Sequence, residues 1–240
     1  MAAKKNQSLE GYEVLLCVTG GIACYKTADL TSKLVQAGAG VTVAMTDAAQ
    51  EFIRPLTFQT LTGRRVFTTL WQSTEYYSSG HISLTEAADL MIVAPATANV
   101  LAKMAAGMAD DLVSTMILAT TGACPILAAP AMNTRMLSAP AVKANHATLK
   151  KWGVQFVGPA AGRLACGTIG EGRLAEPEEI LEAAAELLLK NSPKAKVAPE
   201  VQADRKKFLQ EIEMFRKGLK KGRFSDSTKL IRDDRDQGRQ

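Results

Sequence analysis

Hydrophobic residues in the first 190 positions form short, nearly continuous runs, separated by longer segments of mixed polarity. Continuous apolar runs of this length are typical of strands that are buried on both faces, as in a parallel sheet. Two of the most apolar runs end at Pro95 and Pro130, and each then opens into a loop. The predicted strands are 12–20, 41–45, 65–71, 89–95, 124–130 and 154–158.

The segments between these runs repeat apolar residues every three or four positions, which is the spacing of an amphipathic helix. Thr46 and Asp47 form a good N-cap for a short helix, whereas Gly38 ends a longer one. The predicted helices are 21–38, a short segment after Thr46, 97–122, 139–153 and 176–190. Strands alternating with helices predict a three-layer α/β/α, Rossmann-like domain with a mostly parallel sheet over residues 12–190.

The N-terminal arm, residues 1–11, contains basic residues but lacks the apolar stretch of a signal peptide. No segment reaches the roughly 18 uninterrupted apolar residues of a membrane-spanning helix. We therefore expect a cytoplasmic protein that does not enter a membrane.

The net charge of +5 comes from the basic C-terminal tail, residues 191–240. This tail contains 14 Lys and Arg against 8 Asp and Glu, a charge of +6 that leaves −1 for the rest of the chain. Since the domain itself has no excess of positive charge, we expect no nucleic-acid partner. Apolar residues from Val201 to Leu219 lie on one stripe of an amphipathic helix that ends at Gly222. This helix either docks on its own or a neighbouring subunit, or binds a membrane or another partner.

The four cysteines, Cys17, Cys24, Cys124 and Cys166, have neither C-x-x-C spacing nor a paired framework. Reduced cytoplasmic thiols are therefore expected, without a metal site. Cys166 stands among four glycines in the segment GRLACGTIGEGRL, residues 162–174. Such a segment loses much backbone entropy on ordering, so it is a poor place for a structural thiol. The alternative is that Cys166 takes part in a reaction.

Ligands of a doubly wound sheet bind beyond the carboxyl ends of its strands, and this sequence places unusual residues there. Gly20 and Gly21 lie between a strand and a helix, where backbone N–H groups can hold a phosphate. The dinucleotide fingerprint G-x-G-x-x-G is absent because Ala23 and Cys24 replace its later glycines. The sequence therefore favours a mononucleotide phosphate over NAD, and a tight turn without a ligand is the alternative.

Three polar side chains near predicted loops are further candidates. His81 enters a predicted helix after a loop and is a catalytic candidate, whereas His146 in a lysine-rich helix is expected to be a solvated surface residue. Asn99 and Asn133 each follow a strand that ends in proline, in the sequences PATAN and PAMN. An amide suits a flavin edge or a substrate carboxylate, but asparagine is equally suited to cap a helix.

Taken in order, the motifs TGGIACYK, MTDAA, HISL, APATANVLAKMAAGMADDL, PAMNTRM and LACGTIGEGR resemble the homo-oligomeric flavin-containing cysteine decarboxylases. The resemblance covers residues 12–190 and is greatest to members that decarboxylate 4'-phosphopantothenoylcysteine to 4'-phosphopantetheine in coenzyme A biosynthesis. It implies FMN as cofactor and a homo-oligomer, a trimer or an assembly of trimers. It also implies a reaction of thiol oxidation, CO2 loss, protonation and re-reduction of the enethiol. Residues 191–240 are too short and polar for the synthetase domain often fused to such enzymes, so a stand-alone decarboxylase is expected.

The resemblance also implies a role for individual residues. Cys166 would be the acid on a flap, with Gly167, Gly170 and Gly172 serving as hinges rather than packing positions. His81 would act at the active site, as a base or as a group that holds the carboxylate. The remaining residues implied are Gly20, Gly21, Thr46 and Ser114 for the FMN phosphate, Ala96, Thr97 and Asn99 along the flavin, and Asn133 and Met136 for the substrate.

Three other functions remain open. An oxidative decarboxylase of peptidyl cysteine would stop at the enethiol and would not need Cys166. A flavin prenyltransferase shares the fold but not the combination of His81, PAMN and the Cys-Gly segment. The third alternative, a flavin-binding regulatory subunit, is not an enzyme. The chain departs from relatives in reading TEAAD at 85–89, where Arg-Trp often follows the HISL motif, and this bears on subunit packing near His81.

Overall fold

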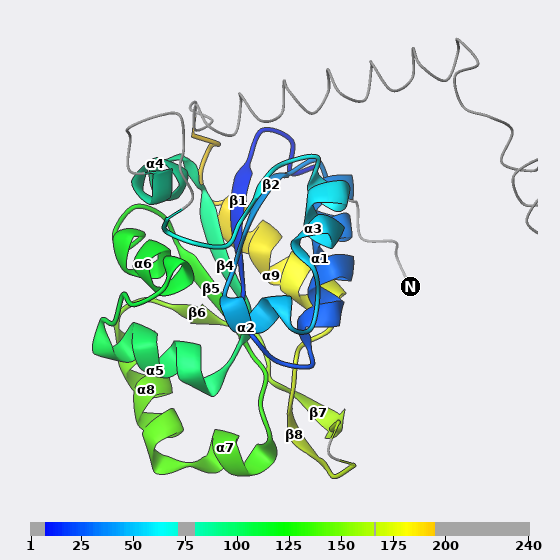
Figure 1. Cartoon of the computed structure of the whole chain (residues 1–240), viewed down its shortest axis with the longest axis vertical. Helices are drawn as coiled ribbons and strands as arrows, with labels where there is room; N and C mark the ends of the chain where they lie inside the picture. The colour runs from blue at the N-terminus through cyan, green and yellow to red at the C-terminus, as the bar shows by residue number, and fades with distance from the viewer. Residues whose placement is uncertain (1–7, 72–79, 166, 195–240) are drawn as a thin grey trace, which may run out of the picture.

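A six-stranded sheet, in which every neighbouring pair of strands is parallel, organises the fold (Figure 1). The computed structural model describes residues 8–71, 80–165 and 167–194. The strand order is β3-β2-β1-β4-β5-β6. Successive strands are added on one side of β1 up to β3, and from β4 onward on its other side. The strands are β1 (Glu13–Val18), β2 (Gly40–Met45), β3 (Val66–Phe67), β4 (Leu90–Ala96), β5 (Ile126–Pro130) and β6 (Gln155–Phe156).

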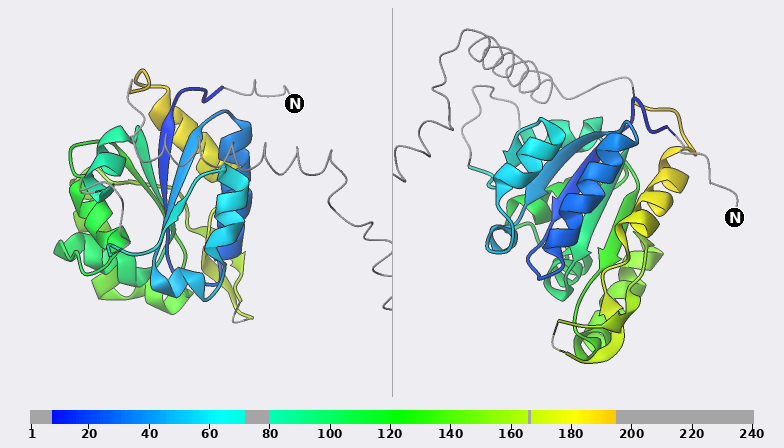
Figure 2. Two further views of the ribbon diagram at one scale, coloured as in Figure 1. Left: turned by 45° about the horizontal axis from the view of Figure 1, so that its top comes forward. Right: turned by 90° about the vertical axis from the view of Figure 1, so that its right-hand side faces the viewer.

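Helices cover both faces of this sheet and make the three layers that the sequence predicts (Figure 2). Helices α1, α3 and α9 pack on one face, and α4, α5, α6 and α8 pack on the other. The helices are α1 (Cys24–Gln36), α2 (Asp47–Gln50), α3 (Pro55–Thr62), α4 (Gly80–Ala87), α5 (Ala98–Ala106), α6 (Leu112–Ala119), α7 (Thr134–Ser138), α8 (Pro140–Lys151) and α9 (Pro177–Leu188).

The side chains of β1 show why a continuous apolar run forms a central strand. Val14, Leu16 and Val18 belong to the core beneath α1 and α9, whereas Leu15 and Cys17 belong to the core on the opposite face. All five are at most 1% exposed. Because successive side chains of a strand point to opposite faces, burial on both faces requires an apolar residue at every position.

The long helix predicted over 97–122 is in fact two helices, α5 and α6. Gly107 ends α5 in the left-handed conformation, with φ +66°. Asp111 then caps α6, since its carboxylate accepts a hydrogen bond from the backbone N–H of Ser114 at 2.8 Å. A left-handed glycine commonly ends a helix and an aspartate commonly begins one. These signals were missed because the helical spacing of apolar residues continues on both sides of them.

Further elements also differ from the predictions. The strand expected over 65–71 is reduced to the two residues of β3, and helix α3 was not predicted. A second, antiparallel pair was also not predicted: β7 (Ala160–Arg163) and β8 (Ile169–Arg173) form a hairpin across the glycine-rich segment. This hairpin projects beyond the end of the sheet, next to α7 (Figure 1).

The chain beyond α9 crosses the end of the sheet where the strands begin. Lys194 donates from Nζ to the carbonyl oxygens of Glu86, Ala88 and Ala123 at 3.1, 2.8 and 2.9 Å. Its backbone N–H also donates to the Asp89 carboxylate at 2.7 Å. Residues 191–194, which the sequence assigns to the tail, are therefore fastened to the domain. No helix in the described ranges is long and apolar enough to cross a membrane.

The tail helix expected between Val201 and Leu219 lies outside the described residues.

Candidate active site

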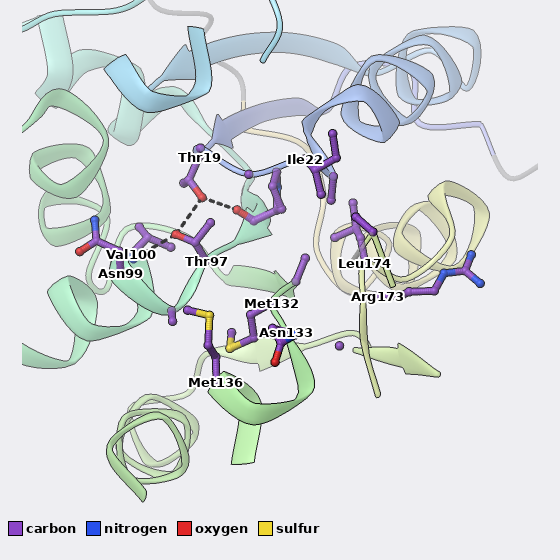
Figure 3. A pocket seen from close by; sticks show the side chains of 18 of the residues that line it. Thr19, Ile22, Thr97, Asn99, Val100, Met132, Asn133, Met136, Arg173 and Leu174 are labelled. Atoms are coloured by element: carbon purple, nitrogen blue, oxygen red, sulfur yellow. Dashed lines mark hydrogen bonds between the residues drawn. The ribbon is translucent and has the colours of Figure 1, made fainter. Parts of the chain in front are cut away.

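A cavity of about 960 Å³ opens at the carboxyl ends of the strands (Figure 3). Its walls come from the turn between β1 and α1, the start of α5, the loop between β5 and α7, and the β7–β8 hairpin. The cavity lies at the reversal of strand order between β1 and β4, which is where doubly wound sheets bind ligands. Seven of the predicted site residues line it: Gly20, Gly21, Thr46, Thr97, Asn99, Asn133 and Met136.

The turn between β1 and α1 presents backbone to the cavity. Gly20 faces Ala48 so closely that an added Cβ would overlap the side chain and backbone of that residue. Helix α1 begins at Cys24 without a side-chain cap, because its N-cap residue is Ala23, and its first turn carries no acidic residue. A helix N-terminus that is neither capped nor neutralised is suited to an anionic group.

Hydrogen bonds join this turn to the start of α5. The Thr19 hydroxyl donates to the carbonyl oxygen of Pro95 at 2.5 Å and lies 3.3 Å from the Thr97 hydroxyl (Figure 3). The Thr97 Oγ1 in turn accepts from the backbone N–H of Val100 and caps α5. Thr46 caps α2 in the same way, by accepting from the N–H of Ala49. The caps thus fix the strand ends that surround the cavity.

Asn133 and Asn99 occupy different positions on their helices. The side-chain oxygen of Asn133 accepts a hydrogen bond from the backbone N–H of Arg135 at 2.8 Å, so the residue caps α7. Asn99 lies inside the first turn of α5, whose cap is Thr97, and the capping alternative for Asn99 is therefore wrong. Met136, which is 49% exposed, lies on α7 across from Met132 and gives this wall a soft, apolar character (Figure 3).

A charged pair closes the side of the cavity formed by α5 and α6. Lys103 Nζ lies 2.7 Å from the Asp110 carboxylate and 2.6 Å from that of Asp111. Burial alone would raise the pKa of Asp111, but the hydrogen bonds from Lys103 and from the N–H of Ser114 outweigh it, and the net pKa is lowered. Asp111 is therefore ionised at neutral pH. The positive charge of Lys103 is balanced by the carboxylates of Asp110 and Asp111.

Two predicted site residues lie outside the cavity lining. Ala96 is fully buried in the core between the sheet and α5. Ser114 is 2% exposed, and its hydroxyl accepts from the N–H of Asp111 within the α6 capping box. Its hydroxyl is thus engaged in holding the start of a helix, which accounts for its burial away from the cavity.

Of the two predicted catalytic residues, the structure describes only the backbone of His81. His81 falls in the first turn of α4, and its side chain is outside the described atoms, as is the whole of Cys166. Ala165 and Gly167 on either side of Cys166 line the cavity. In contrast, α4 packs beside the beginning of β1, where its Leu84 shares a core with Leu15.

Two of the three hairpin glycines are packing positions, contrary to the prediction that none of them is. A Cβ on Gly170 would lie 2.6 Å from the Thr134 hydroxyl oxygen, and one on Gly172 would overlap the carbonyl oxygen of Met132. Gly167, with φ +85° and nothing within 4 Å of an added Cβ, has open space around it. The base of the hairpin is therefore fitted against the Asn133 loop.

Several lining residues escaped prediction from the sequence. Thr19, Lys26 and Arg173 reach the cavity because of how β1, α1 and the hairpin meet, which no local spacing reveals. The position of Thr19 directly before Gly20, at a strand end, was a usable signal. Among the described residues, no group of His, Cys, Asp and Glu is arranged to hold a metal ion.

This chain is similar to known proteins over all the residues that line the cavity. The flavoprotein family model matches residues 2–189. The chain belongs to the flavoprotein family. That family match includes every lining residue of the cavity.

One curated relative in the flavoprotein comparison is the coenzyme A biosynthesis bifunctional protein CoaBC of Bacillus subtilis (strain 168). It is 51% identical over 176 residues, which cover 73% of this chain and 43% of that protein. The chain thus spans less than half the length of this relative.

Two solved structures are also similar. A cysteine-to-serine mutant of a PPC decarboxylase, complexed with pantothenoylaminoethenethiol, is 29% identical with a TM-score of 0.67. It covers 76% of this chain and 100% of its own. The FMN-dependent cysteine decarboxylase SpaF is 28% identical with a TM-score of 0.66, and the match covers 76% of this chain and 98% of that one.

The three described cysteines of this flavoprotein are unsuited to acid–base work at neutral pH. Burial raises the pKa of Cys17 and raises that of Cys124 to about 11. Burial also raises the pKa of Cys24, whose thiol donates to the carbonyl oxygen of Thr19 at 2.9 Å. These thiols stay protonated and packed, so they serve as small core residues.

Proposed function

We propose that this chain is an FMN-dependent decarboxylase that converts 4'-phosphopantothenoylcysteine to 4'-phosphopantetheine. The observation that carries the proposal is the meeting of the glycine turn, the Thr97–Asn99 segment and the Asn133–Met136 segment around one cavity. The 51% identity to CoaBC and the likeness to a PPC decarboxylase structure support this substrate class.

The residues present fit FMN. The turn at Gly20 and Gly21 and the uncapped start of α1 offer N–H groups and a favourable dipole to a phosphate monoester. Ile22, Met132 and Leu174 supply apolar surface for a planar ring system. When bound, the flavin supplies the two-electron chemistry that no side chain here can provide.

The chain's own residues would bind and orient the substrate. Asn133 is held in place by its capping bond to Arg135, and its amide N–H groups are suited to a carboxylate. A fixed carboxylate places the bond to be broken in one orientation, which is a large part of such catalysis. The base of the hairpin, fitted against Thr134, would form one wall of the substrate site.

We propose that His81 acts in the cavity of a neighbouring copy. Helix α4 lies at the end of the sheet where the strands begin, whereas α7 and the hairpin lie at the opposite end (Figures 1 and 2). A histidine on α4 cannot serve the cavity of its own chain across the length of β1. A homo-oligomer, most simply a trimer, would bring it to the next site and complete it.

Two measurements test the activity. The purified protein is expected to be yellow and to release FMN on denaturation, and extraction of FAD would contradict the cofactor assignment. Incubation with 4'-phosphopantothenoylcysteine is expected to release CO2 and give 4'-phosphopantetheine. A product lighter by two hydrogens would indicate the oxidative alternative. Flavin without CO2 release would indicate a regulatory subunit.

Mixing inactive variants tests the shared site. His81→Asn and Asn133→Asp chains, each inactive alone, are expected to regain part of the activity when unfolded together and reassembled. Regain requires that the two residues come from different chains at one site. No recovery in mixed oligomers of verified composition would contradict this arrangement, and a fully active monomer would exclude it.

A further inference from the structure

Two cationic side chains at the mouth of the cavity share a single carboxylate oxygen. Lys26 Nζ on α1 lies 2.9 Å from Oε1 of Glu176 and 2.8 Å from Oε2. Arg173 Nη2, on β8, lies 2.5 Å from the same Oε1. The two positive nitrogens therefore cannot be farther apart than the sum of the two distances to that oxygen. Glu176 holds them side by side at the junction of α1 and the hairpin.

The carboxylate stands behind this pair, away from the cavity. Lys26 and Arg173 line the cavity, whereas Glu176 does not. Arg173 projects on the side opposite Asn99 (Figure 3), and Arg163 of the adjacent strand β7 also lines this side. Among the described lining residues, the one carboxylate is Asp111, which is paired with Lys103.

Both side chains keep hydrogen-bond donors beyond those given to Glu176. A lysine ammonium has three N–H donors and an arginine guanidinium has five, arranged in a fork. Lys26 uses two contacts and Arg173 uses one on the carboxylate. The side chain of Lys26 is 15% exposed and that of Arg173 is 36% exposed, so each can be reached from the cavity or its mouth.

Counting Lys26, Arg163, Arg173 and Glu176 together, this side of the mouth carries two positive charges in excess. A phosphate monoester carries close to two negative charges at neutral pH and offers three strong acceptor oxygens. The carboxylates nearest along the chain, Glu171 on β8 and Glu178 on α9, are outside the cavity lining. Glu178 is in addition paired with Lys33.

We propose that Lys26 and Arg173, positioned by Glu176, bind the terminal phosphate monoester of the substrate and make the enzyme selective for the phosphorylated form. This inference rests on the proposed function, because it assigns a subsite to that function's substrate. The start of α1 at Gly20 and Gly21 is a separate place for the cofactor's phosphate. The two phosphates thus have separate donors, backbone N–H groups for one and side-chain cations for the other.

The experiment compares ligands with and without the phosphate. Dissociation constants of the holoprotein for 4'-phosphopantetheine and pantetheine are measured by calorimetry, together with the flavin content of each protein. Charge-assisted hydrogen bonds of this kind are expected to give the wild type a preference of about tenfold or more for the phosphorylated ligand. Lys26→Gln and Arg173→Gln, tested separately, are each expected to lower that ratio several-fold.

Lys33→Gln is the matched control. Lys33 lies on the same helix and also pairs with a carboxylate of α9, but it is outside the cavity lining. The control variant is expected to keep the wild-type ratio of the two dissociation constants. A fall of this ratio in Lys33→Gln would mean that weakening the α1–α9 contact is enough to change it. Ratios that stay at the wild-type value in both Lys26→Gln and Arg173→Gln would overturn the subsite. Loss of FMN with an unchanged ratio would also overturn it, by assigning Lys26 to the cofactor's phosphate.

The two proposals fail in different ways. If the protein shows the expected binding ratios but releases no CO2 from 4'-phosphopantothenoylcysteine, the decarboxylase function fails and the phosphate subsite stands. If CO2 is released equally well from pantothenoylcysteine, and the variants leave this balance unchanged, the function stands and the subsite fails.

Discussion

The backbone N–H of Met132 donates a hydrogen bond to the carbonyl oxygen of Gly172 at 2.9 Å, which ties the loop after β5 to the hairpin. Nearby, the Thr134 hydroxyl donates to the carbonyl oxygen of Glu171 at 2.7 Å. Gly172 has φ +134°, a backbone conformation that side chains rarely adopt. The hairpin base and the Asn133 loop therefore form one fitted unit.

Gly172→Ala tests this unit. The new Cβ meets the Met132 carbonyl and the backbone is strained, so we expect the free energy of unfolding to fall by about 3 kcal/mol. Gly167→Ala, which faces open space, is expected to cost only about 1 kcal/mol from its left-handed backbone. Urea denaturation followed by circular dichroism measures both. Equal losses in the two variants would mean that Gly172 acts only through its backbone freedom.

Asn133→Asp separates the capping role of this residue from its role toward substrate. Aspartate is as good an N-cap as asparagine, so the bond from Arg135 and the stability of α7 are expected to persist. A second carboxylate facing the substrate's carboxylate would misplace it, and turnover is expected to fall by about a hundredfold or more. Unfolding curves, flavin content and the rate of CO2 release are the measurements.

Asn133→Ala is the companion variant. It lacks the cap and is expected to lose about 1 kcal/mol of stability in addition to activity. If Asn133→Asp were as destabilised as Asn133→Ala, the structural role of Asn133 would account for its effect on activity.

The sheet was predictable because each central strand is buried on both faces. The apolar runs that became β1, β4 and β5 are typical of a parallel sheet between helices. The hairpin was not predictable in this way, since Gly162, Gly170 and Gly172 show neither strand nor helix periodicity. What holds it is contact with Thr134 and Met132, far away in the sequence.

The same distinction applies to the cavity. Gly20, Thr97 and Asn133 could be predicted because strand ends and helix caps leave a local signal. Lys26 looked like any charged residue on a helix until β8 and the cap of α9 placed Arg173 and Glu176 beside it. Ser114 shows the converse, because a hydroxyl near a helix start served its own capping box.

Truncation of the tail tests how far the domain extends. Ending the chain after Lys194 is expected to leave stability and flavin binding unchanged, since the contacts of Lys194 are retained. Ending it after Lys190 removes these contacts and the hydrogen bond from the Tyr12 hydroxyl to the carbonyl oxygen of Asn191. The shorter protein is expected to lose about 2 kcal/mol of stability while keeping its flavin. Loss of flavin in either protein would make the tail part of the site.

Cys166→Ser tests the proposed acid. The residues on either side of Cys166, Ala165 and Gly167, line the cavity. A thiol with an ordinary pKa of about 8.5 is protonated at neutral pH and can still give up its proton, whereas a serine hydroxyl is a far weaker acid. We expect the variant to release CO2 but to leave the enethiol unprotonated, so the product is lighter than 4'-phosphopantetheine by two hydrogens.

The decisive measurement is an anaerobic single turnover followed by absorbance and mass analysis. In Cys166→Ser the flavin is expected to stay reduced, because serine would not supply the proton that Cys166 gives to the enethiol. Cys124→Ser is the control, since Cys124 has a pKa raised to about 11 by burial and lies outside the cavity lining. That control is expected to give 4'-phosphopantetheine and oxidised flavin. The same result from Cys166→Ser at a near wild-type rate would contradict the role of Cys166, and the proton would then have to come from another group at the cavity.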